Sequence, residues 1–81
     1  MAIIYELWDV PTRNLVDAYD TEEAALEDVL YTLEHDGEWS VEALLLLRDD
    51  PNTDAKALVA EGMELAEYAK RKLAPTGVAA T

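Results

Sequence analysis

Two N-terminal segments show the alternation of side chains that is typical of β-strands. Residues 2–8 and 15–19 each alternate with period two, and both are rich in residues that favour strands. Residues 10–14 separate them. Because Pro11 fixes φ and removes a backbone donor, and Asn14 tolerates a left-handed conformation, these five residues favour a turn. The pattern predicts a β-hairpin.

The following segment has the period of an amphipathic helix. Apolar residues recur at positions i, i+3, i+4 and i+7: Leu26, Val29, Leu30 and Leu33. Asp20 is expected to cap the first amides, with Glu23 reaching back as in a capping box. Gly37 is expected to end the helix in a left-handed conformation. A helix is therefore predicted between these two signals.

Residues 39–48 fit two structures. Alanine and leucine favour a helix, but the segment between the flanking turn signals is short for one. We predict a strand. Its centre is apolar on both faces, which favours an inner position in the sheet, with helices on one side and a partner on the other.

Residues 55–73 also leave two possibilities open. Apolar residues fit one helical stripe, which would allow a single helix. Gly62 lies in the middle, where glycine costs about 1 kcal/mol relative to alanine. We therefore favour a strand over residues 55–60 followed by a helix over residues 62–73.

Together these elements predict a small two-layer α+β domain with the order ββαβ(β)α. The strand in brackets completes a second hairpin with the strand before it. The domain is expected to span residues 1–74. Residues 75–81 begin with Pro75 and lack periodicity, so they are predicted to form a flexible tail.

Several short motifs resemble those of a group of small uncharacterised bacterial proteins. The motifs are Tyr5-Glu6-Leu7-Trp8-Asp9, Asn14-Leu15-Val16, Tyr19-Asp20-Thr21-Glu22-Glu23-Ala24-Ala25-Leu26 and Ala60-Glu61-Gly62-Met63-Glu64-Leu65. The order of a strand pair, a Thr-Glu-Glu-Ala helix and a strand is also similar to antitoxins of the HicB type. The sequence departs from those antitoxins because it lacks a third strand before the helix and a DNA-binding extension. The first group implies no activity.

The chain is short and contains no cysteine. Its 81 residues form one domain with a thin core, and 51% of them are hydrophobic, which is enough for a globular fold. Disulfides, thiolate metal sites and a cysteine nucleophile are excluded. Domains of this size often complete their burial by pairing, so we expect a homodimer.

Charge narrows the range of partners. Eighteen acidic and six basic residues give a net charge of −12, and residues 1–54 hold fifteen of the acids with only two bases, Arg13 and Arg48. Phosphate is repelled by such a surface, so direct binding to nucleic acid or to an anionic membrane is disfavoured, and a basic protein partner is favoured. The N-terminus has no secretory signal pattern, which predicts a cytoplasmic protein.

The candidate partner-binding residues are carboxylates and tryptophans of the hairpin, the first helix and the following segment: Trp8, Asp9, Asp17, Asp20, Glu23, Glu27 and Trp39. Tryptophan is enriched at the energetic centres of interfaces, and clustered carboxylates attract lysine and arginine. The alternative is that the carboxylates only keep the domain soluble and the aromatic residues line the rim of the core.

Metal binding and catalysis have weaker support. Asp50, Asn52, Asp54 and Glu61 have the spacing of calcium ligands in an EF-hand loop, but the required glycine is replaced by Ala55, so no metal site is assigned. His35 is expected at a helix end on the surface, and Ser40 is the sole serine, so no catalytic triad and no cofactor are predicted.

The sequence therefore predicts a non-enzymatic acidic interaction protein that binds a basic partner or itself, as an antitoxin, inhibitor or adaptor does. A nucleic-acid mimic that inhibits a DNA- or RNA-binding protein is the first alternative, and a small metal-binding protein is the second.

Overall fold

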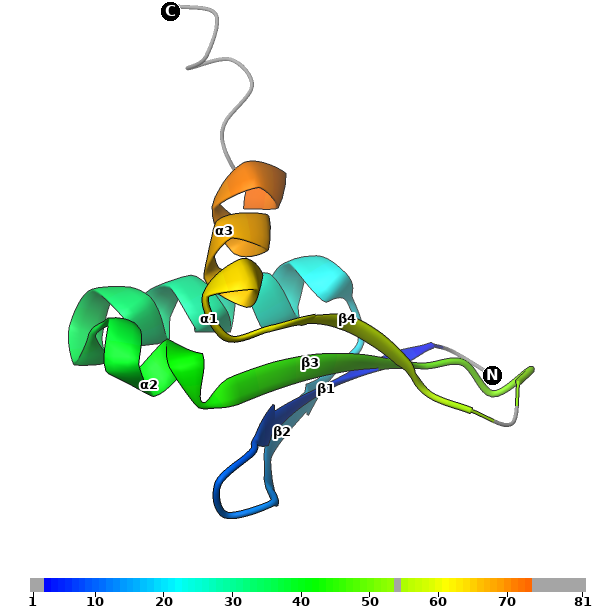
Figure 1. The fold of residues 1–81 in the computed structure, drawn as a ribbon. Helices are drawn as coiled ribbons and strands as arrows, with labels where there is room; N and C mark the ends of the chain where they lie inside the picture. Colours follow the sequence, from blue (N-terminus) through cyan, green and yellow to red (C-terminus); the bar gives the residue numbers. More distant parts are fainter. Residues whose placement is uncertain (1–2, 54, 74–81) are drawn as a thin grey trace, which may run out of the picture.

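The computed structural model describes residues 3–53 and 55–73, which form an antiparallel sheet with helices on one side (Figure 1). The strands are β1 (Ile4–Asp9), β2 (Asn14–Tyr19), β3 (Leu44–Asp49) and β4 (Ala57–Glu61). The helices are α1 (Glu22–Asp36), α2 (Glu38–Glu42) and α3 (Gly62–Leu73). The strand order is β2-β1-β3-β4. The predicted α+β class is confirmed.

The register of the two inner strands decides which side chains share a face. Leu7 of β1 lies opposite Leu46 of β3, and Trp8 lies opposite Leu45. Because side chains alternate along a strand, Leu7 and Leu46 point to the helices, whereas Trp8 and Leu45 point away from them. Leu47, next to Leu46 in sequence, shares the side of Trp8.

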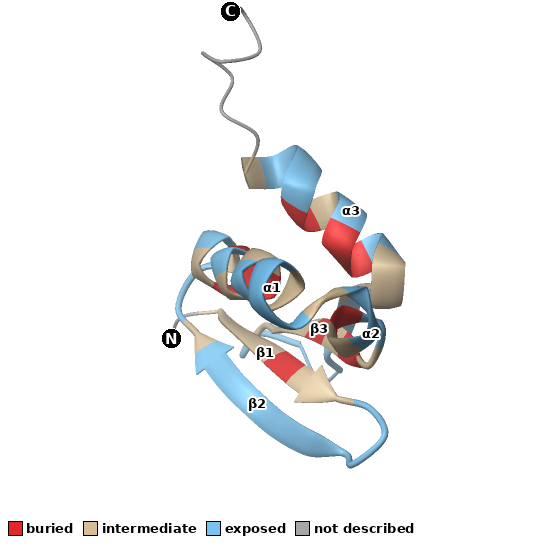
Figure 2. Ribbon diagram, turned by 90° about the vertical axis from the view of Figure 1, so that its left-hand side faces the viewer, coloured by how far each residue is buried: buried red, intermediate tan, exposed pale blue. Residues whose placement is uncertain are grey.

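The core lies between the sheet and the helices. Its buried residues come from both inner strands and from all three helices: Leu7, Ala25, Leu26, Val29, Val41, Leu44, Leu46, Leu65, Ala66 and Ala69. Figure 2 shows buried residues in β1 and along α3, while β2 is exposed along most of its length. One apolar layer therefore holds the domain together.

The N-terminal hairpin and the first helix form, but two predicted details are wrong. The left-handed residue of the turn is Arg13 (φ 59°) and not Asn14, which is the first residue of β2, and the helix cap differs. The side chain of Thr21, not that of Asp20, accepts a hydrogen bond from the backbone amide of Ala24 (3.1 Å). Thr21 has the extended backbone of an N-cap residue, and its hydroxyl is placed to reach the third amide of the helix. Asp20 lies one residue too early to do so.

Gly37 ends α1, as predicted, although its conformation differs from the expected one. Its φ is 94° and its ψ is 174°, outside the left-handed helical region. Its amide still donates to the carbonyl of Leu33 (3.1 Å). The extended ψ lets the chain start α2 immediately.

The prediction of one strand over residues 39–48 is half wrong. Residues 38–42 form the short helix α2, and only residues 44–49 form a strand. Val41 of α2 is fully buried against the core, so tertiary packing stabilises a helix too short to be stable alone. The predicted inner position is confirmed, since β3 pairs with both β1 and β4.

Residues 55–73 form the strand and helix that we favoured over a single helix. β4 ends at Glu61, and α3 begins directly at Gly62, whose φ is +59°. Glycine adopts this conformation without the steric cost that a side chain brings, so the chain turns from strand to helix within one residue. The predicted tail, residues 75–81, lies outside the described residues, and the boundary at residue 74 stays a prediction.

Candidate functional site

A groove of about 530 Å³ lies on the helix side of the sheet, between the hairpin and the helices α1 and α2. We call it the acidic groove. Its polar lining consists of Asp9, Thr12, Asn14, Asp28, Thr32, Asp36, Trp39 and Ser40. Its apolar lining consists of Leu7, Leu15, Val16, Ala43 and Leu44. Three carboxylates and an exposed tryptophan therefore meet over an apolar floor.

Helical periodicity and strand ends bring these groups together. Asp28, Thr32 and Asp36 are spaced four residues apart on α1, so they lie along one side of the helix. Asp9 is the last residue of β1 and faces them across the groove. Trp39 lies in α2 with 74% of its surface exposed. The groove thus depends on three separate elements.

Two of the carboxylates are held by neighbouring hydroxyls. Thr12 of the hairpin turn donates to Asp9, and Tyr19 of β2 donates to Asp28. Burial of the phenol, together with its hydrogen bond to Asp28, raises the pKa of Tyr19 above its ordinary value. Each of these two carboxylates therefore accepts a hydrogen bond from a side chain of the hairpin.

The lining contains no lysine, arginine or histidine. Negative charge in the groove is thus not neutralised by a basic residue of the lining itself. Long cationic side chains have an apolar stem and a charged end, and they bind where both are matched. An apolar floor beneath carboxylates is such a place.

The opposite side of the sheet forms a second surface, which we call the open face: Ile4, Trp8, Leu45, Leu47 and Leu58. Leu58 is 53% exposed and the other four are half-buried. None of the described helices lies over this side (Figure 1).

An ion pair lies across the open face. Glu6 accepts hydrogen bonds from the indole of Trp8 (3.1 Å) and from the ammonium of Lys56 (2.9 Å). Burial opposes ionisation of Glu6, but these two donors outweigh it and lower its pKa. The same hydrogen bond raises the pKa of Lys56. Both groups are therefore charged, and they neutralise each other.

The structure separates the residues that the sequence proposed as one partner surface. Trp39 and Asp9 line the acidic groove, whereas Trp8 lies on the open face. Asp17 and Asp20 are exposed near the hairpin edge, and the remaining two, Glu23 and Glu27, are exposed on α1. The carboxylates among the described residues thus lie on several surfaces, which gives no support to a nucleic-acid mimic with a single line of charge.

Asp28 and Asp36 are groove residues that were not among the proposed partner-binding positions. Their signal is present in the sequence, because they are eight residues apart and share a helix side with Thr32. What the sequence lacks is the position of Asp9 opposite them, which depends on how the hairpin packs against α1.

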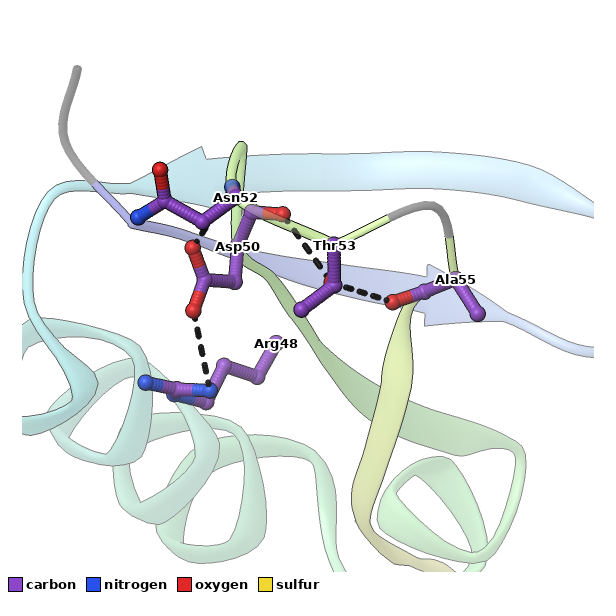
Figure 3. Close-up of polar contacts among 5 residues, drawn as sticks. All are labelled: Arg48, Asp50, Asn52, Thr53 and Ala55. Carbon is purple, nitrogen blue, oxygen red and sulfur yellow. Dashed lines mark hydrogen bonds and ion pairs between the residues drawn. The ribbon is translucent and has the colours of Figure 1, made fainter.

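The described residues of the loop after β3 bond to one another or to Arg48 (Figure 3). Asp50 accepts a hydrogen bond from the backbone amide of Asn52 (2.9 Å). Its Oδ2 lies 3.8 Å from Nη1 of Arg48, with which it forms an ion pair. Glu61 pairs with Leu45 at the other end of β3. Asp54 lies outside the described residues. Among the residues that are described, no group of acidic or histidine side chains is arranged to hold a metal ion.

His35 lies in the last turn of α1, on the surface, as predicted. Its ring stacks on Tyr31 with 3.9 Å between centroids, and Nδ1 lies 2.9 Å from the carbonyl of Tyr31. Ser40 instead lines the acidic groove.

Comparison of the chain with protein-family models, with curated proteins and with solved structures found no match. The resemblances noted from the sequence therefore stay predictions. None of the helices in residues 3–53 and 55–73 is long and apolar enough to cross a membrane.

Proposed function

We propose that the protein is a small acidic, non-enzymatic interaction protein that binds a basic segment of a partner protein, as an antitoxin, inhibitor or adaptor does. The observation that supports it is the acidic groove, in which Asp9, Asp28 and Asp36 surround an apolar floor beside the exposed Trp39. The proposal includes self-association into a homodimer and action in the cytoplasm.

An arginine or lysine side chain complements this groove. Its aliphatic stem packs on Leu44 and Val16, and its charged end meets Asp28 and Asp36. Trp39 adds a cation–π contact, worth about 0.5–1 kcal/mol at an exposed position. Arginine is favoured over lysine because its planar guanidinium binds carboxylates through two hydrogen bonds and stacks on an indole.

Net charge contributes to the same role over a longer range. With a net charge of −12, the protein attracts a basic partner before contact, which speeds association and makes the rate sensitive to salt. The groove then supplies the specific contacts. A bound partner would have its basic segment covered, which is inhibition by occlusion.

The test is titration of the full chain with a short arginine-rich peptide, followed by calorimetry and by tryptophan fluorescence. Two double variants carry the same change of net charge. Asp28→Asn with Asp36→Asn removes charge from the groove, whereas Glu27→Gln with Glu34→Gln removes it from exposed positions of the same helix.

The groove variant is expected to bind the peptide about tenfold more weakly, and the control less than about twofold, since loss of a positioned charge pair costs at least about 1.4 kcal/mol. Trp39→Ala should remove most of the fluorescence change, whereas Trp8→Phe should keep it. Equal weakening by both double variants would show that binding depends on net charge alone and would contradict a site in the groove.

A further inference from the structure

The acidic groove has two walls, α1 and β2, that run side by side in opposite directions. At one end, Tyr19, the last residue of β2, donates to Asp28 of α1. At the other end, the backbone amide of Val10 in the hairpin turn donates to the carbonyl of Ala43, directly after α2 (2.8 Å). Asp36 ends α1 two residues before α2 begins, so it lies at this second end. The groove is therefore elongated.

Each end of the groove offers carboxylate to a basic side chain. Asp28 and Asp36 are eight residues apart on α1, which corresponds to roughly 12 Å along the helix. Asp9 lies at the Asp36 end, because it pairs with Leu44, two residues after α2. Trp39 of α2 is at the same end. One end thus has two carboxylates and an indole, and the other has one carboxylate.

Between these ends, a bulge makes the hairpin wall apolar. The register of β2 with β1 shifts between Leu7 and Trp8, which leaves Val16 as an extra residue. Successive side chains of a regular strand point to opposite faces, but Leu15 and Val16 both line the groove. Leu15 is 47% exposed and Val16 is 51% exposed. An apolar side chain of a ligand would cover this surface.

The length and volume of the groove favour an extended ligand. In an extended segment, side chains at positions i, i+2 and i+4 point to the same side, and the outer two lie roughly 13 Å apart. This distance matches the spacing of Asp28 and Asp36. A helix about 10 Å wide and as long as that spacing would occupy roughly 900 Å³, which exceeds the groove volume of about 530 Å³.

We propose that the acidic groove binds an extended segment of a basic protein in which an apolar residue lies between two arginines, two positions from each. One arginine binds Asp36 and Asp9 and stacks on Trp39. The apolar side chain packs on Val16, and the second arginine binds Asp28. This inference rests on the proposed function, since it states which kind of basic segment the groove takes.

The test is calorimetric titration of the full chain with three peptides of identical composition and blocked ends. In the first peptide, a serine separates a central leucine from an arginine on each side. The second has the two arginines next to each other, and the third keeps the arginines in place but moves the leucine by one position.

The first peptide is expected to bind at least about tenfold more tightly than the second, because only one of two adjacent arginines can face the groove. It should bind at least about threefold more tightly than the third, in which the leucine points away from the groove.

A substitution on each side of the sheet tests the apolar contact. Val16→Ser should weaken binding of the first peptide about fivefold, but it should weaken a peptide with serine in place of the leucine less than about twofold, as a direct contact requires. Leu58→Ser makes a similar change on the open face, at a position that is 53% exposed, and should affect neither peptide. Both positions are exposed, so circular dichroism should show that both variants fold.

Equal affinity for the three peptides, with all three weakened by Asp28→Asn combined with Asp36→Asn, would overturn this inference and leave the groove as a binding site for basic segments. Equal weakening of the leucine and serine peptides by Val16→Ser would also overturn it. If none of the peptides bound, the proposed function would fail together with the inference. The two failures are therefore distinguishable.

Discussion

The two faces of the sheet are built from the same residue type and differ in what covers them. Leu46 and Leu47 are neighbours in β3, yet Leu46 is fully buried under the helices and Leu47 is half-buried on the open face. Both helices that pack on the sheet, α1 and α3, lie on the side of Leu46 (Figure 2). The difference shows that the connections between elements, rather than the composition of the strand, decide which face becomes the core.

The largest expected loss of stability comes from substitutions on the face of the sheet that the helices cover. Leu46→Ala should lower the free energy of unfolding by about 2–5 kcal/mol, because it leaves a cavity in a closely packed core. Leu47→Ala should cost roughly 1 kcal/mol, because its site is already partly open to water. Urea denaturation of both variants measures the contrast.

Leu46→Met is the control, since it keeps the volume and should cost less than about 1.5 kcal/mol. Equal losses for Leu46→Ala and Leu47→Ala would mean that the open face is as fully covered in solution as the other, as it would be in a tight dimer. Repeating the measurement at a lower protein concentration would show whether a dimer covers the open face, because dilution dissociates a dimer.

A smaller loss of stability is expected at Gly62, where the chain turns from β4 into α3. Gly62→Ala should cost about 1–2 kcal/mol, because an L-residue is strained at a φ of +59°. An added Cβ would lie 3.7 Å from the carbonyl oxygen of Glu42, an ordinary contact, so the cost is conformational rather than steric.

Gly62→Asn should cost less than Gly62→Ala, since asparagine tolerates the left-handed region. Thermal unfolding measures both. If alanine were tolerated as well as glycine, the strand-to-helix turn would have another conformation in solution.

The smallest loss of stability is expected at the contact between α1 and α3, two of the helices that cover the sheet. The hydroxyl of Tyr68 donates to Glu22 (2.8 Å), and burial together with this hydrogen bond raises the pKa of Tyr68 to about 12. The ordinary pKa is about 10, so folding favours the protonated phenol. This contribution is complete below about pH 10 and is lost as the pH rises through 12.

Tyr68→Phe should therefore have a slightly lower free energy of unfolding than the original chain at pH 7. This difference in free energy should become smaller above pH 10. Denaturation at several pH values measures it. Tyr31→Phe is the control, because the Tyr31 hydroxyl forms no hydrogen bond with another described residue and the variant should show no such narrowing. A gap that stays constant up to pH 12 would contradict the role of the hydroxyl.

The sequence identified many residues of the candidate site, but it did not show which of them lie together in space. The carboxylates and Trp39 were identified, yet Trp8 was grouped with them although the sheet separates the two. Asp28 and Asp36 follow helical spacing, but only the packing of the hairpin against α1 brings Asp9 opposite them. Long-range placement of this kind is not encoded in local spacing.

The sequence by itself determined the hairpin and the presence of α1 between residue 20 and Gly37, because these depend on local backbone preferences and on periodicity within one element. For residues 55–73 it favoured a turn at Gly62 but left a single helix open. Only the tertiary structure decided the helix at residues 38–42, whose stability comes from burial of Val41. It also decided which leucines of the run Leu44–Leu47 face the core. Four identical residues carry no alternation, so pairing with β1 and the side taken by the helices had to make that choice.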